Sequence, residues 1–185
     1  DVAEVEFYGN PGKIEAPAFG VQEATGSFDG EVADNLFDGD ENTKWCFDST
    51  AFTEPYVIWN VENALNVTGY EIVTANDNAD YTGRNPGAWT LSGSADGENW
   101  TVISDVAADT VLQDVNFTPF TFAADAAGEY SWFKYEIKNV VGGGVCQISG
   151  LNLLTGDVTP SAAPVEEAPV EEVVEEAPVE EAPVE

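Results

Sequence analysis

The most informative stretch of the chain is residues 34–46, which read DNLFDGDENTKWC. Carboxylates, amides and a hydroxyl surround a turn at Gly39, and an aromatic residue and a thiol follow directly. Oxygen ligands around a tight turn suit Ca²⁺, which takes roughly 6–8 of them in irregular geometry. The stretch is not an EF-hand, because it lacks that loop's closing glutamate and no helical pattern flanks it. An ordinary Asp-Gly turn between two strands explains the same residues, so residue types alone leave both interpretations open.

Composition restricts the function. The 185-residue chain carries a formal charge of −30 with five Lys and Arg residues, which excludes nucleic acid as a partner and disfavours anionic membrane surfaces. The chain has no histidine, so zinc sites and serine- or cysteine-histidine catalysis lack their usual parts. No apolar run approaches the length of a transmembrane helix, which argues against direct membrane insertion. The chain lacks methionine and ends partway through a repeat, and we expect it to be a processed piece of a longer protein.

Short runs with strand character dominate the chain, and none shows a helical face of ten residues. Residues 1–10 alternate apolar and acidic positions before a break at Pro11-Gly12. An Asp-Gly turn at 95–99 predicts a β-hairpin between two of the later runs. Many short strands at this spacing predict an all-β sandwich. The expected strands are 1–10, 56–61, 67–75, 88–94, 100–103, 115–122, 130–139 and 145–154.

The composition changes after residue 157, which divides the chain into an N-terminal strand at 1–12, a sandwich domain at 13–157 and a tail at 158–185. The motif Ala-Pro-Val-Glu-Glu recurs in the tail, which holds nine glutamates and no cation. Regular prolines and repelling glutamates favour an extended chain. We therefore interpret the tail as a disordered acidic linker or stalk, with a docking peptide or a diffuse cation binder as alternatives.

Cys46 and Cys146 stand on predicted strands. A disulfide between them would close a loop of about 100 residues and stabilise the fold by on the order of 4–5 kcal/mol. We predict this disulfide, and the alternative is two buried free thiols. Asn66, Asn99 and Asn116 begin Asn-X-Thr sequons, so we also predict a glycoprotein.

Four segments together resemble the discoidin, or coagulation factor V/VIII (F5/8) type C, domain family, and the likeness is closest to family 32 carbohydrate-binding modules. The resemblance covers about residues 25–156. The segments are LFDGDENTKWC, GYEIVTANDNADYTGRNPGAWTLSGSADGENWTVI, YSWFKYEIKN and VCQISGLNLL, and they occur in the family's order.

The resemblance implies a jelly-roll β-sandwich of the galactose-binding-domain-like type with a structural Ca²⁺. The implied ligands are the Asn35 carbonyl, the Asp38 and Asp40 side chains and Thr43, with Gln147 of the last strand closing the site. Family members usually carry a glutamate where this chain has Gly150, and Glu4 is a candidate substitute. Residues 1–9 also resemble the family's closing strand, so they could end a preceding domain of a multidomain array.

Sugar recognition needs planar polar groups and an aromatic face. The loop at residues 76–85 supplies Asn76, Asn78, Tyr81 and Arg84, and Phe52 could approach from the loop after the acidic motif. The alternative for Arg84 is a structural pairing with Asp77 or Asp80. We expect the five tryptophans to lie in the core. Galactose-binding relatives often use a histidine, so the identity of the sugar cannot be transferred.

The first functional hypothesis is a non-catalytic, extracellular carbohydrate-binding and adhesion module of a secreted or cell-surface multidomain protein. Its partners would be glycans or neighbouring extracellular domains. The alternative is a calcium-stabilised structural repeat of a filament, coat or matrix, including a homopolymer, without sugar binding. An enzyme is not expected, because glycosidase carboxylates must face each other across a cleft and the Asp77/Asp80 pair does not imply this.

Overall fold

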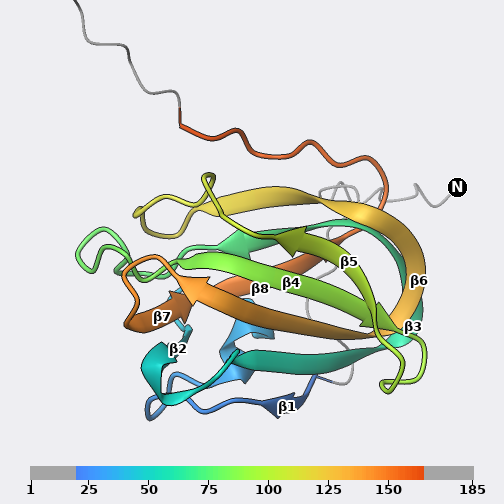
Figure 1. Cartoon of the computed structure of the whole chain (residues 1–185), viewed down its shortest axis with the longest axis horizontal. Coiled ribbons are helices and arrows are strands. Elements are labelled where there is room, and N and C mark those ends of the chain that lie inside the picture. Colours follow the sequence, from blue (N-terminus) through green and yellow to red (C-terminus); the bar gives the residue numbers. More distant parts are fainter. Residues whose placement is uncertain (1–19, 165–185) are drawn as a thin grey trace, which may run out of the picture.

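The computed structural model describes residues 20–164 (Figure 1). Within this range the chain forms eight strands and two short 3-10 helices, and no helix reaches the length that crossing a membrane requires. The strands are β1 (Gly20–Ala24), β2 (Trp45–Asp48), β3 (Tyr56–Val73), β4 (Pro86–Ser94), β5 (Thr101–Val106), β6 (Pro119–Val140), β7 (Val145–Ile148) and β8 (Gly150–Leu154). The 3-10 helices are η1 (Ala33–Phe37) and η2 (Ser49–Ala51).

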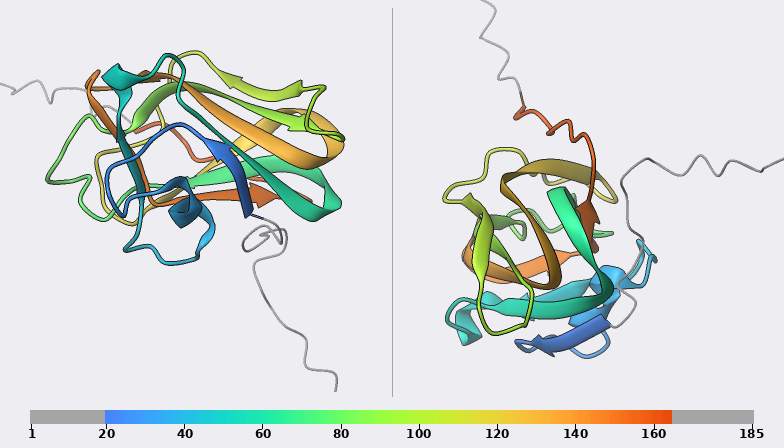
Figure 2. Two further views of the ribbon diagram at one scale, coloured as in Figure 1. Left: turned by 90° about the horizontal axis from the view of Figure 1, so that it is seen from below. Right: turned by 90° about the vertical axis from the view of Figure 1, so that its right-hand side faces the viewer.

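Two long strands, β3 and β6, join the two layers of the sandwich. The first half of β3 pairs with β1 and with the second half of β6, and β4 and β5 extend this layer. The second half of β3 lies between β8 and the first half of β6 in the other layer. Register shifts at 60/65 and 67/69 mark the bend, which the end-on view of Figure 2 shows. Gly69 is required there, because a Cβ would lie 2.6 Å from the Phe122 carbonyl oxygen.

The sandwich and the 88–103 hairpin are confirmed: β4 pairs antiparallel with β5 across the Asp-Gly turn. The separate strands expected at 56–61 and 67–75 are one continuous bent strand, and a single strand, β6, starts at Pro119 and includes 130–139. The alternation pattern could not reveal these continuities, because each bend interrupts it. The strand predicted at 1–10 and most of the tail lie outside the described residues.

The core lies between the layers and contains Trp45, Trp59 and Trp89, all fully buried, while Trp100 and Trp132 are only half-buried. A polar contact crosses the core: Trp89 Nε1 donates to the Tyr70 hydroxyl at 2.8 Å, and that hydroxyl lies 2.9 Å from Ser104 Oγ. Burial raises the pKa of Tyr70 to about 12. The phenol therefore stays neutral and links the layers as a neutral hydrogen-bonding group.

The domain continues past residue 157, where the sequence pattern placed its end. Ser161 N donates to the Thr121 carbonyl at 2.8 Å, and Thr121 N donates to Ser161 Oγ at 2.9 Å. Thr68 Oγ1 also donates to the Gly156 carbonyl at 2.7 Å. These contacts hold the segment after β8 on the sandwich up to the point where the acidic repeats begin.

The predicted disulfide is wrong: both cysteines are free and buried. In the β2–β7 pair Cys46 faces Gln147 and Phe47 faces Cys146, so the cysteines are offset by one position. A one-residue offset places two side chains on opposite faces of a strand pair. Burial, followed by the nearby Glu31, raises the pKa of Cys46 to about 12, and burial also raises the pKa of Cys146.

We predict that neither thiol reacts with a thiol reagent in the native protein at about pH 8, since a buried neutral thiol is a poor nucleophile. Unfolding in denaturant without reductant should release both thiols for titration. A Thr50→Cys variant, with its cysteine at an exposed position, provides the matched control and should react at once. Recovery of no thiols from the denatured, unreduced protein would contradict the free state.

Candidate functional site

The loop between β3 and β4 projects from one end of the sandwich, next to the loop between β6 and β7 (Figure 1). Its turn is closed by Asp80 N and Tyr81 N, which donate to the Asp77 carbonyl at 3.1 and 3.0 Å. Gly142 N donates to the Gly83 carbonyl at 2.6 Å and ties the two loops together. Gly83 has a φ of +78°, a conformation that favours glycine. The loop therefore has a defined shape.

A buried polar network lies beneath this loop, with the Gln147 side chain at its centre. The Gln147 amide nitrogen donates to Asp77 Oδ1 at 2.9 Å and to Asn78 Oδ1 at 2.8 Å. Its carbonyl oxygen accepts from Lys44 Nζ at 3.2 Å and from Arg84 at 3.3 Å. Lys44 Nζ also lies 2.8 Å from both Asp77 carboxylate oxygens. The Lys44 cation is thus paired with the Asp77 carboxylate, and both ends of the Gln147 amide have hydrogen-bond partners, as buried polar and charged groups require.

The exposed side of the loop presents an aromatic ring. Tyr81 is 51% exposed, and the Arg84 guanidinium carbon lies 4.1 Å from the centre of its ring. This distance is within the range of a cation–π contact. Because Gln147 engages the same guanidinium from below, the Tyr81 ring and the Arg84 plane are held together. The pair is an ordered combination of an aromatic face and planar N–H donors at the loop end.

The structure brings together only two of the five predicted sugar-contacting residues, Tyr81 and Arg84. Asn78 is completely buried and donates to Asn85 at 2.6 Å, so it is structural. The Asn76 side chain donates to the Asn42 carbonyl at 3.3 Å. Phe52 packs edge-on against Phe47, with ring centroids 6.4 Å apart, at the margin of the core.

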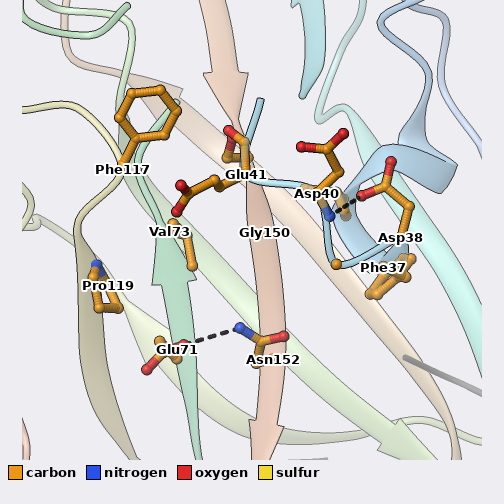
Figure 3. A pocket seen from close by; sticks show the side chains of 13 residues that line it. Phe37, Asp38, Asp40, Glu41, Glu71, Val73, Phe117, Pro119, Gly150 and Asn152 are labelled. Atoms are coloured by element: carbon orange, nitrogen blue, oxygen red, sulfur yellow. Dashed lines mark hydrogen bonds between the residues drawn. The ribbon is translucent and has the colours of Figure 1, made fainter. Parts of the chain in front are cut away.

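The acidic loop, residues 38–44, connects η1 to β2. Hydrogen bonds of its own side chains determine its shape. Asp38 Oδ1 accepts from Asp40 N at 2.8 Å (Figure 3), and Asp38 Oδ2 accepts from Thr43 Oγ1 at 2.7 Å. Thr43 Oγ1 also lies 2.8 Å from the Asp40 carbonyl. Backbone and side-chain hydrogen bonds from Asn42 lower the pKa of Asp40. The loop is therefore a compact set of oxygens that includes two carboxylates.

These oxygens fit Ca²⁺ by donor type, since carboxylate, carbonyl and hydroxyl groups are its usual ligands. Ser149, between β7 and β8, joins the closing segment to the loop: its Oγ lies 2.7 Å from the Glu41 and Thr43 carbonyl oxygens. No group of three or more Asp, Glu, Cys or His side chains within residues 20–164 could hold a metal. A calcium ion here would therefore depend on carbonyl and hydroxyl oxygens as well as on Asp38 and Asp40.

Two of the predicted ligands use their side chains in other hydrogen bonds. Gln147 hydrogen bonds in the network beneath the 76–85 loop, so the structure does not place its side chain with the other four ligands. The Asn35 side chain donates to the Gly30 and Lys44 carbonyls at 3.1 and 2.9 Å, which fixes the turn whose backbone carbonyl the resemblance implies as a ligand. Glu4, the candidate substitute ligand, lies outside the described residues.

The sequons differ in accessibility. Asn66 and Asn99 are exposed, whereas Asn116 is half-buried and accepts from Ala79 N at 2.8 Å. Their glycosylation stays a prediction.

Comparison with known proteins assigns the family. The profile of the F5/8 type C domain matches residues 21–149, and the chain belongs to this family. A search of curated proteins gave no significant match.

Solved structures show the same fold. The CBM32-3 module of a family 31 glycoside hydrolase from Clostridium perfringens is 15% identical with a TM-score of 0.63, and the match covers 78% of this chain and 95% of that one. The family 32 module of Clostridium perfringens NanJ, in complex with galactose, is 18% identical with a TM-score of 0.60 (77% and 97% covered). An F5/8 type C domain from Bacteroides fragilis is 17% identical with a TM-score of 0.63 (81% and 99% covered).

We predict that Lys44→Met lowers the free energy of unfolding by about 3 kcal/mol, because it leaves Asp77 without its cation and removes one of the two cationic donors to Gln147. The loss should fall at the low end of the range for a broken buried pair, since the Asp77 side chain keeps 26% of its surface exposed. Denaturant unfolding of Lys44→Met beside Lys138→Met, a surface cation, measures the difference. Equal losses in the two variants would show that the network contributes no more than an ordinary surface pair.

Proposed function

We propose that this chain is a non-catalytic carbohydrate-binding and adhesion module of an extracellular multidomain protein, and that the Tyr81–Arg84 pair contacts the glycan. The observation that carries the proposal is the exposed Tyr81 ring, held against an Arg84 guanidinium that Gln147 fixes from below. An aromatic face packs on the C–H surface of a sugar, and guanidinium N–H groups donate to its hydroxyls. The NanJ module, which has the same fold, was solved in complex with galactose, and this supports glycan binding by analogy.

We further propose that the acidic loop binds a structural Ca²⁺ through Asp38, Asp40, Thr43 and the Asn35 carbonyl. The convergence of Asp38 Oδ2 and the Asp40 carbonyl on Thr43 Oγ1 supports this role. The ion would bind the loop to the closing segment and would not take part in a reaction. A strongly acidic chain with three sequons suits a calcium-containing extracellular medium, which supports a secreted or cell-surface location.

Glycan-array screening, followed by calorimetry on the best ligand, tests the glycan proposal. Tyr81→Ala should weaken binding at least about tenfold, or ~1.4 kcal/mol. Arg84→Lys should weaken it as well, because it keeps the charge but removes the planar donors. Phe28→Ala removes another exposed aromatic residue and is the matched control. Silence across the array would reject the lectin role and favour the structural repeat of an extracellular assembly.

Thermal unfolding in Ca²⁺ and in EDTA tests the metal proposal, because an ion that binds only the folded state raises the melting temperature. Asp38→Asn should abolish the calcium-dependent shift. Gly150→Glu should enlarge it, since Gly150, Asp38 and Asp40 line the same cleft and the substitution adds a carboxylate there. Gly150→Gln controls for the added bulk. Identical melting curves for the native chain in Ca²⁺ and EDTA would reject the site.

A further inference from the structure

Three loops meet at Gly83, at the same end of the sandwich (Figure 1). Asp114, in the loop between β5 and β6, accepts from Gly83 N at 3.1 Å. The Gly83 carbonyl accepts from Gly142 N of the loop between β6 and β7. A second hydrogen bond, from Ala79 N to Asn116 Oδ1 at 2.8 Å, holds the β5–β6 loop against the 76–85 loop. The β5–β6 loop therefore adjoins the residues that we propose contact the glycan.

The Asp114 carboxylate lies beside the backbone of Arg84. Its Oδ1 accepts from Gly83 N, directly before Arg84, and from Asn85 Nδ2, directly after it, at 3.1 and 3.3 Å. Consecutive Cα atoms are only about 3.8 Å apart, so these two contacts bracket Arg84 closely. Asp114 is exposed, and its Oδ2 accepts no hydrogen bond within residues 20–164. One oxygen thus fixes the side chain, and the other is available to a ligand.

The neighbouring Arg84 and Asp114 do not neutralise each other. Within residues 20–164 the Arg84 guanidinium contacts Gln147 and the Tyr81 ring, and it forms no ion pair with Asp114. A guanidinium only donates hydrogen bonds, and an ionised carboxylate only accepts them. A sugar hydroxyl does both. The loop end therefore offers neighbouring hydroxyls a donor, an acceptor and an aromatic face.

We propose that Asp114 is a further glycan-contacting residue, which accepts from a sugar hydroxyl and makes the site select neutral sugars over uronates. This inference rests on the glycan role proposed for Tyr81 and Arg84. A hydroxyl that donates to a carboxylate forms a charge-assisted hydrogen bond. Arg84 alone would attract the carboxylate of a uronate, but Asp114 places a like charge beside it, and such repulsion discriminates between ligands.

Titrations monitored by NMR test the preference with D-galactose, D-glucose and D-mannose, each compared with its own uronate. The members of each pair differ at C6 alone, where a hydroxymethyl group is replaced by a carboxylate. At least one neutral hexose should bind and shift resonances around Gly83. Its uronate should bind at least about tenfold more weakly, the cost of one repulsive contact at the site.

Asp114→Asn tests the residue itself. The substitution keeps an oxygen that can accept from Gly83 N and Asn85 Nδ2, and it replaces Oδ2 with a neutral donor. It should weaken binding of the hexose about tenfold, whereas the uronate should lose less, so the ratio of the two affinities should fall. A role confined to holding the loop would weaken both sugars by the same factor. The ratio therefore stays informative even where the substitution disturbs the loop.

A matched control lies in the turn between β4 and β5, at the opposite end of β4. Glu98→Gln removes an exposed charge there and should leave both affinities unchanged. Hexose binding that Tyr81→Ala abolishes but Asp114→Asn leaves intact would overturn the inference and keep the proposed function. A uronate that binds the native chain as tightly as its hexose would also overturn it. Silence of all the sugars would reject the glycan role and this inference together.

Discussion

The side-chain amide of Gln147 is the interaction on which the loop end of this domain depends. It is fully buried. Its hydrogen bonds of 2.8 to 3.3 Å connect β7 to Lys44, the residue before β2, and to three residues of the 76–85 loop, Asp77, Asn78 and Arg84. A buried amide that lost one of these partners would carry the desolvation cost without compensation. The requirement to satisfy all of its groups at once fixes the relative positions of segments that are far apart in the sequence.

This constraint also explains how a very acidic chain positions two of its five cations. Lys44 and Arg84 both direct their side chains to Gln147 from opposite loops, and Lys44 is neutralised by Asp77. These two cations therefore organise the loop end, whereas Lys134 and Lys138 pair with Glu136 on β6. Arg84 differs from Lys44 because its guanidinium also covers the exposed Tyr81 ring. The same residue thus belongs to the buried network and to the surface that we propose contacts the glycan.

The sequence predicted the architecture because period-two alternation and an Asp-Gly turn are local signals. It failed where the answer depends on register between distant strands. Cys46 and Cys146 belong to adjacent strands, but an offset of one position sends their side chains to opposite faces. Asn78 and Arg84 are both predicted sugar contacts, and the burial of Asn78 against Asn85 separates them. The resemblance suggested Gln147 as a metal ligand, and its central place in the buried network carries no signal in a single sequence, since a glutamine in a strand is ordinarily exposed.

Gly150 shows how one position can alter two properties of the same region. A glutamate there would add a carboxylate beside Asp38 and Asp40 and would fill part of the cleft that Glu41, Glu71 and Phe117 line. Glycine instead leaves the acidic loop with fewer charged oxygens for a cation and leaves the space beside Val73 and Asn152 open. Ser149 maintains the contact between the closing segment and the loop carbonyls, and its hydroxyl does not depend on a metal. The fold therefore keeps the closing segment against the acidic loop without a carboxylate at position 150.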